Sequence, residues 1–371
     1  MKTKLVFFAS ALSLGLALSL PAQAIVYTAS NEVDGNRVIA FDVDRDGSPV
    51  EIGSFDTQGT GTGAPIGNQA ALTTDASDRW LFVTNAGDGS LTSFRLQPRG
   101  LEFVNKVPSR GHSAISVTVF GTLVYVLNEG DGTSSDPNLR YDNISGFRFT
   151  AGGVLVPIPD STRILDSTGL TAPAQIGFNK SGTVLLITEK ATNTLTTFVM
   201  QQDDTPESTP LKRPSAVPTP FGFQFGDRDF VFITEANGGG PGVTASYRVD
   251  RETGEVSSLV DLIEQGSATC WTVLFSDQTI GYSINTGSDS VSLYRINFDG
   301  TLDPFFRIRS NREIQSGDAP RDAALTQNNQ HLFVLNNGDG KLRAFRVARS
   351  GSIHRRGVAP IPPSATGLMA R

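Results

Sequence analysis

A short apolar segment that ends in Asn or Glu recurs along most of this sequence. In chain order the copies are residues 26–29 (VYTA, a degenerate copy), 82–85 (FVTN), 125–128 (YVLN), 186–189 (LITE), 232–235 (FITE), 282–285 (YSIN) and 333–336 (FVLN). Seven copies over residues 25–371 give about 50 residues per repeat, which is the spacing of propeller blades rather than of helical solenoids. The sequence therefore predicts an all-β, seven-bladed propeller.

Each repeat also contains segments suited to four strands. In the last complete repeat they are residues 322–325, 331–335, 342–347 and 352–356, separated by turns rich in Asn, Ser and Gly. The second segment is apolar almost throughout, as expected for a strand that neighbouring blades cover on both faces. We therefore predict four-stranded blades.

The two ends of the chain predict how the ring closes. Residues 364–368 (SATGL) resemble residues 267–271 (SATCW), which open the sixth repeat, whereas the first repeat begins directly with its second strand at Ile25. A propeller must close its ring or leave sheet edges exposed. We predict that the C-terminal segment supplies the innermost strand of the first blade, so that residues 25–371 form one closed domain.

The first 24 residues have the three parts of an export signal. Lys2 and Lys4 precede an apolar stretch at residues 5–20, and Ala22-Gln23-Ala24 is a small-residue cleavage site. No later apolar stretch is long enough to span a bilayer. We therefore expect a signal peptide at residues 1–24 and a secreted or periplasmic protein without a membrane span.

Charge and cysteine content exclude further classes. Removal of Lys2 and Lys4 changes the formal net charge from -6 to -8 and leaves no basic stripe, which argues against nucleic acid as a partner. Cys270 is the only cysteine in the sequence, so no intrachain disulfide can form. We expect a monomer.

The YVTN-like repeats resemble those of the seven-bladed β-propeller lactonase family, which includes bacterial 6-phosphogluconolactonase and fungal carboxymuconate cyclase. The likeness covers residues 25–371 and implies a small lactone substrate, although the predicted export argues against phosphogluconolactone, a cytoplasmic metabolite. The sequence departs from the family in one respect. The family tends to open several inner strands with His or Arg, whereas repeats four and five open with residues 173–175 (PAQ) and 218–221 (PTPF).

Two circles of residues are predicted to surround one mouth of the central channel. In a four-stranded blade the start of the innermost strand and the end of the second strand lie on the same face, where a small-molecule site is expected. The first circle contains Gln69, His112, Gln175, Phe221, Trp271 and Arg321. The second circle contains Asn85, Asn128, Glu189, Glu235, Asn285 and Asn336.

Glu189 and Glu235 are the predicted acid–base pair. They replace the recurring Asn in neighbouring repeats, and two carboxylates at one mouth would raise the proton affinity of one another. One would then act as a general base and the other as an acid. Alternatively, both are solvated surface groups, or Glu189 pairs with the adjacent Lys190.

Arg321 and His112 complete the predicted catalytic set. Arg321 follows Pro320 and resembles the Pro-Arg step by which the lactonase family brings an arginine into the channel from its last blade. There it would bind a substrate carboxylate or a developing oxyanion. Its alternative role is an ion pair with Asp322 or with a neighbouring loop. His112 would move a proton, although a lone histidine is more often packed or hydrogen-bonded.

The remaining candidates would contact substrate. Trp271 and Phe221 would provide an apolar wall, or pack between blades. The polar candidates are Gln69, Gln175 and Asn128, although Asn128, like Asn85 and Asn336, opens an Asn-x-Gly-Asp-Gly turn that its side chain can stabilise.

Two functions of different classes follow from these features. The first is a lactonase-like hydrolase or cycloisomerase that acts on a small carboxylated lactone and requires no metal or other cofactor. The alternative is a non-catalytic extracytoplasmic propeller that binds a small ligand or an unidentified protein partner. The missing channel His and Arg residues favour the second function, and the Glu pair with Arg321 favours the first.

Overall fold

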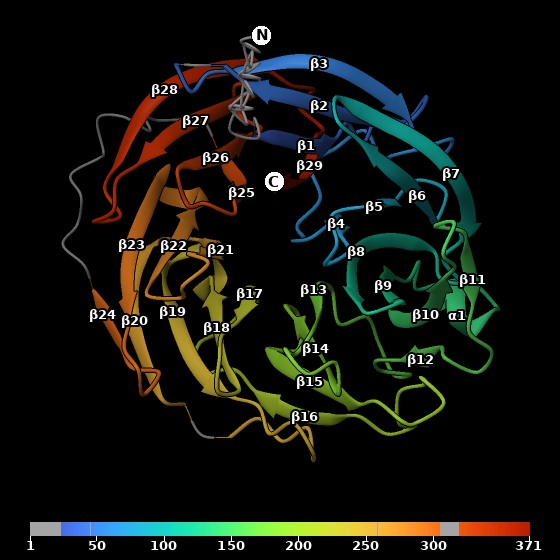
Figure 1. The fold of residues 1–371 in the computed structure, drawn as a ribbon. Coiled ribbons are helices and arrows are strands. Elements are labelled where there is room, and N and C mark those ends of the chain that lie inside the picture. The colour runs from blue at the N-terminus through green and yellow to red at the C-terminus, as the bar shows by residue number, and fades with distance from the viewer. Residues whose placement is uncertain (1–23, 45, 258, 305–318) are drawn as a thin grey trace, which may run out of the picture.

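Seven antiparallel sheets follow one another around a central axis (Figure 1). The structure is a computed structural model, and it describes residues 24–44, 46–257, 259–304 and 319–371. The prediction of an all-β, seven-bladed propeller is confirmed. The predicted signal peptide lies outside the described residues except for Ala24. Among the described residues, no helix has the length and apolarity needed to cross a membrane.

Each blade is one sheet whose strands follow one another from the axis outward. From the axis, blade 1 contains β29 (Thr366–Ala370), β1 (Ile25–Ala29), β2 (Arg37–Val43) and β3 (Pro49–Asp56). Blade 2 contains β4 (Leu72–Thr74), β5 (Trp80–Asn85), β6 (Ser90–Gln97) and β7 (Gly100–Pro108). Blade 3 contains β8 (Ser113–Phe120), β9 (Leu123–Glu129), β10 (Asn143–Phe149) and, both paired with β10, β11 (Leu155–Pro157) and β12 (Arg163–Ile164).

The other four blades have four strands each. Blade 4 contains β13 (Pro173–Phe178), β14 (Val184–Glu189), β15 (Thr194–Val199) and β16 (Leu211–Pro214). Blade 5 contains β17 (Pro220–Phe225), β18 (Phe230–Glu235), β19 (Pro241–Arg248) and β20 (Asp261–Ser267). Blade 6 contains β21 (Thr269–Leu274), β22 (Ile280–Asn285), β23 (Ser290–Ile296) and β24 (Leu302–Pro304). Blade 7 contains β25 (Pro320–Leu325), β26 (His331–Asn336), β27 (Lys341–Val347) and β28 (Ile353–Pro360).

Short helical turns occur only in connections of the described chain. The helix α1 (Pro137–Arg140) lies between β9 and β10, where the side chain of Asp136 caps its first turn. The 3-10 helices η1 (Asn237–Gly239) and η2 (Thr286–Ser288) follow β18 and β22. All three lie on the face of the ring where second strands end.

The hydrophobic core lies between blades rather than inside them. Every residue of β5, β14, β18 and β22 is buried, because adjacent blades cover both faces of these second strands. One core cluster joins Tyr27 and Ala40 of blade 1 to Leu81 and Phe94 of blade 2. The outer strands are much more exposed, as in β3 and β28.

The predicted closure of the ring by the two chain ends is confirmed. In blade 1, β29 pairs with β1, with Ala370 opposite Val26 and Thr366 opposite Ala29. The hydroxyl of Thr28 donates to the carbonyl oxygen of Gly367 at 2.7 Å, and this strengthens the junction. The first blade therefore combines the last strand of the chain with the first three.

Candidate active site at the channel mouth

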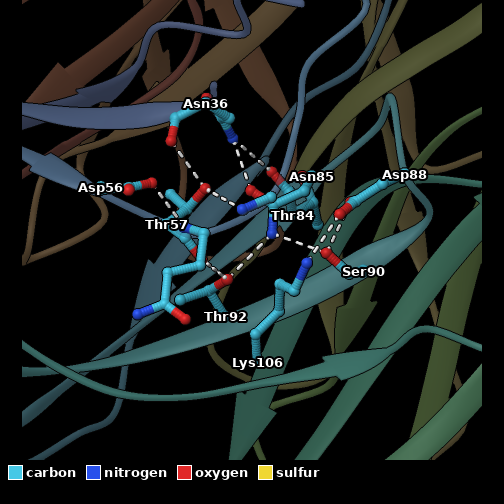
Figure 2. A network of polar contacts seen from close by, with 11 residues as sticks. Asn36, Asp56, Thr57, Thr84, Asn85, Asp88, Ser90, Thr92 and Lys106 are labelled. Atoms are coloured by element: carbon cyan, nitrogen blue, oxygen red, sulfur yellow. Dashed lines mark hydrogen bonds and ion pairs between the residues drawn. The ribbon is translucent and has the colours of Figure 1, made fainter. Parts of the chain in front are cut away.

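The recurring Asn at the end of the second strand joins adjacent strands and blades. Figure 2 shows this network around Asn85. The amide nitrogen of Asn85 donates to the hydroxyls of Ser90 at 3.0 Å and Thr92 at 2.9 Å on β6, while its amide oxygen accepts from Asn36 of blade 1 at 2.8 Å. Asn285 bonds in the same way to Ser290 and Ser292. These side chains face the third strand and not the channel.

Replacing Asn85 by alanine should lower the free energy of unfolding by about 2 kcal/mol, because buried partners on two blades lose their hydrogen bonds. Urea unfolding followed by circular dichroism measures this change. Asn138→Ala is the matched control, since Asn138 is exposed in α1 and should give wild-type stability. Equal stability of the two variants would contradict the structural role of Asn85.

Glu189 occupies the same position and makes equivalent bonds. Its carboxylate accepts from the hydroxyl of Thr196 at 2.5 Å and from that of Thr192 at 2.7 Å, and Lys212 lies 4.0 Å away. Glu189 is fully buried, and this burial raises its pKa. The alternative pairing with Lys190 is not formed, because Lys190 lies against Glu129 instead.

Glu235 is also fully buried, in a separate network formed by blade 5 and the connection that precedes it. It accepts from the hydroxyl of Tyr247 at 2.6 Å and from the backbone N–H of Val217. Ala245 stands where blades 2, 3, 4 and 6 carry the hydroxyl partner, so the longer Glu235 side chain reaches Tyr247, two residues farther along β19. Burial raises the pKa of Glu235 to about 7. The pKa values of Glu189 and Glu235 are therefore raised by burial and not by repulsion between the two carboxylates, as the sequence had suggested. The catalytic role of the pair stays a prediction.

The predicted polar contacts Gln175, Asn128 and Gln69 are buried and already hydrogen-bonded. Gln175 accepts from the N–H of Phe223 at 2.7 Å and donates to its carbonyl at 3.1 Å, which joins β13 to β17. Asn128 donates to the side chain of Asn143 at 3.0 Å, and Gln69 donates to the carbonyl of Thr272 at 3.0 Å. Their role in binding substrate also stays a prediction.

Phe221 and Trp271 pack against each other in a core cluster that joins blades 4 to 7, which is the alternative role predicted for them; their contact with substrate stays a prediction. Their rings meet edge to face with centroids 4.9 Å apart, and both side chains are buried. The ammonium of Lys190 lies 5.3 Å from the centroid of the Phe221 ring. The two aromatic residues therefore adjoin a cation contributed by blade 4.

Lys190 and Glu129 are the mouth residues that the sequence analysis missed. Each directly follows the recurring Asn or Glu, and successive side chains of a strand point to opposite faces. The other blades carry Ser30, Ala86, Ala236, Thr286 and Asn337 at this position. Comparing the repeats at the residue that follows the recurring Asn or Glu would have shown that only blades 3 and 4 carry a charged side chain at this position.

Lys190 is anchored at the mouth by two backbone carbonyls, beside Glu129. The ammonium of Lys190 lies 3.9 Å from the Glu129 carboxylate and donates to the carbonyl oxygens of Pro173 at 2.9 Å and Gly67 at 2.5 Å. Burial lowers the pKa of Lys190 and raises that of Glu129. Lys190 and His112 both act to lower the pKa of Glu129, so His112 lies close enough to influence this carboxyl group.

Arg321 lies on the other side of the mouth, in blade 7. Pro320 pairs with Asn336 and Asp322 with Leu335, so Arg321 occupies the bulge at the start of β25. Its side chain is partly buried, and within the described part of the chain it makes no hydrogen bond or ion pair. Asp322, the alternative partner predicted from the sequence, is fully buried instead, and burial raises its pKa well above the ordinary value.

Cys270 occupies the corresponding bulge in blade 6. Lys190 and Arg321 both act to lower its pKa, which places the thiol within the influence of both cations. Burial dominates and raises the pKa of Cys270 to about 12, so the thiol is protonated near neutral pH. The mouth therefore combines two cations, one carboxylate and the exposed imidazole of His112, beside the buried pair of Phe221 and Trp271. No cluster of three or more His, Cys, Asp or Glu side chains in the described ranges is placed to hold a metal ion.

Comparison with known proteins confirms the resemblance to the lactonase family. Residues 98–275 match the family model described as lactonase, 7-bladed beta-propeller. A putative 6-phosphogluconolactonase from Bacteroides fragilis superposes with a TM-score of 0.71 at 14% identity, covering 95% of this chain and 99% of that chain. A periplasmic gluconolactonase from Pseudomonas aeruginosa superposes with a TM-score of 0.73 at 16% identity, covering 94% and 98%. No curated protein sequence gave a match. At these identities the structural likeness establishes the fold alone.

Proposed function

We propose that this protein, a lactonase-type seven-bladed propeller, is a hydrolase that opens a small carboxylated lactone at the mouth of its central channel. The observation that carries the proposal is the guanidinium of Arg321, which is partly buried at the mouth and has no partner among the described residues. A cation held in this way attracts an anionic group or a developing negative charge.

The mouth residues can divide the steps of lactone hydrolysis. Glu129 takes a proton from water as the water oxygen attacks the lactone carbonyl carbon. Arg321 stabilises the oxyanion of the resulting tetrahedral intermediate or holds the substrate carboxylate. The ring C–O bond then breaks, and His112 supplies a proton to the departing alkoxide, which gives a hydroxy acid. Phe221 and Trp271 provide the apolar wall beside the ring.

Glu129 suits the base better than the two carboxylates predicted from the sequence. Its side chain is 34% exposed, whereas Glu189 and Glu235 are fully buried and each carboxylate is already hydrogen-bonded. We therefore assign structural roles to Glu189 and Glu235. Because the sequence predicts export, we place the substrate in the periplasm or outside the cell.

The direct test is turnover by the purified protein. A panel of five- and six-membered lactones, each with and without a carboxylate, would be followed by proton release with a pH indicator. We expect turnover of the carboxylated members. Hydrolysis of none of them would overturn the proposal.

Glu129→Gln should lower kcat/KM by about a hundredfold, within the range that a general base contributes. In the wild-type protein kcat/KM should fall as pH falls through the raised pKa of Glu129, because the base must be ionised to accept a proton. Glu102→Gln is the control, since Glu102 is exposed on β7. If Glu129→Gln kept the wild-type kcat/KM and the same fall of kcat/KM at low pH, Glu129 would be excluded as the base.

A non-catalytic binding propeller is the second candidate, and Cys270 and Lys190 favour it. The thiol is protonated, and the ammonium already donates to two backbone carbonyls, so neither is free to act as a nucleophile. Arg321 alone would still hold an anion. Calorimetric binding of small carboxylates without any turnover would support this function.

A further inference from the structure

Three residues of the connection between blades 1 and 2 lie at the centre of the ring, near its axis. The connection leaves β3 and runs toward the middle of the ring before β4 begins (Figure 1). We call residues 67–69, which are Gly67, Asn68 and Gln69, the axial tether. Asn68 and Gln69 are almost fully buried, although they belong to a connection and not to a strand.

Asn68 binds to three blades at once. Its amide nitrogen donates to the carbonyl of Ile115 in blade 3, and its amide oxygen accepts from the hydroxyl of Thr366 in blade 1 at 2.9 Å. Its backbone carbonyl accepts from the indole N–H of Trp271 in blade 6 at 2.7 Å. These partners are far apart around the ring, so Asn68 must lie near the axis.

Gln69 crosses the axis. Its backbone N–H donates to the carbonyl of Ala174 in blade 4 at 3.1 Å, while its side chain reaches the carbonyl of Thr272 in blade 6 at 3.0 Å. A Cβ atom on Gly222 of blade 5 would lie only 1.9 Å from the side-chain oxygen of Gln69. Because blades 5 and 6 lie opposite blade 2 in a ring of seven, the axial tether crosses the channel and the side chain of Gln69 contacts its far wall.

We infer that the axial tether closes the central channel and forms the floor of the mouth, so that a ligand enters and leaves through one face only. The tether also positions the mouth residues, because Gly67 accepts from Lys190 and Asn68 accepts from Trp271, whose ring packs against Phe221. This inference holds for a catalytic or a purely binding mouth, and its test requires no turnover.

The test measures how readily acrylamide quenches the fluorescence of Trp271. The sequence contains two tryptophans, so Trp80→Phe leaves Trp271 as the only one. In that background Gln69→Ala should raise the Stern–Volmer quenching constant several-fold, since the shortened side chain opens the channel beneath the indole. Gln69→Met fills the same space without the hydrogen bonds and should keep Trp271 shielded, with a lower thermal midpoint. Gln330→Ala, an exposed residue of blade 7, is the control.

Gly222→Ala provides a second variant that leaves the tether sequence intact. The added Cβ should displace Gln69 and raise quenching in the same direction, and the effects of Gly222→Ala and Gln69→Ala should be less than additive. Unchanged quenching in both single variants, with folded circular dichroism spectra, would overturn the inference. Equal quenching in Gln69→Ala and Gln69→Met would also contradict closure of the channel by this side chain.

Discussion

Arg321→Ala should lower kcat/KM for a carboxylated lactone by about 10²–10³, the loss that follows removal of one oxyanion-stabilising donor. The reason is that Arg321 has no ion pair or hydrogen bond with any described residue, so its charge is available to the reacting molecule. Truncation removes that charge without leaving a buried carboxylate unpaired. Initial rates with the lactone panel would measure the change.

Two further variants define what Arg321 contributes. Arg321→Lys keeps the charge but loses the planar guanidinium, which can bind a carboxylate through two N–H groups. This variant should therefore be faster than Arg321→Ala but slower than wild type, and it should discriminate less between carboxylated and neutral lactones. Arg349→Ala removes an exposed arginine of the same blade and should leave the rate unchanged. If Arg321→Ala hydrolysed carboxylated lactones as fast as the control, the proposed role of Arg321 would be wrong.

The fold followed from the sequence because each repeat contains its own strand and turn signals. The second strands are buried by neighbouring blades, so their apolar runs are conspicuous, and the C-terminal likeness to the sixth repeat correctly predicted the pairing of β29 with β1. The split outer edge of blade 3 was not predicted. Its strands β11 and β12 have only three and two residues, and their pairing with β10 depends on the position of that strand.

The candidate site was harder to predict, because the repeat draws attention to the last residue of each second strand and not to the residue that follows it. Glu189 and Glu235 end their strands facing the third strand, whereas the next residue faces the axis, as Lys190 does through its bond to Gly67. That signal was present in the sequence, since only Glu129 and Lys190 are charged at this position.

Contacts across the axis could not be inferred from any pattern in the sequence. Lys190 meets Gly67 across 123 residues, and Gln69 meets Thr272 across 203. Such pairs depend on how the connection between blades 1 and 2 enters the ring. Repeat comparison describes what the blades share, and not the path of a connection between two blades.

Glu235 should make the protein less stable as pH rises from about 4.5 to about 7, because its pKa is raised from 4.5 to about 7 in the folded state. The folded protein holds this proton where the unfolded chain releases it, so the free energy of unfolding falls with rising pH. A shift of this size corresponds to about 3 kcal/mol once the pH exceeds 7. Glu235→Gln removes the ionisation, so its stability relative to wild type should rise by this amount between pH 4 and pH 8.

Urea unfolding of both proteins across that range would measure the difference. The wild-type slope alone does not isolate Glu235, since burial also raises the pKa of Glu189 and Asp322, and both act in the same direction. Subtracting the two curves cancels these contributions. Glu255→Gln, an exposed residue of the same blade, should leave the wild-type curve unchanged. Parallel curves for Glu235→Gln and wild type would mean that Glu235 is ionised in the folded state at pH 5, and the buried network with Tyr247 would then have to stabilise a carboxylate.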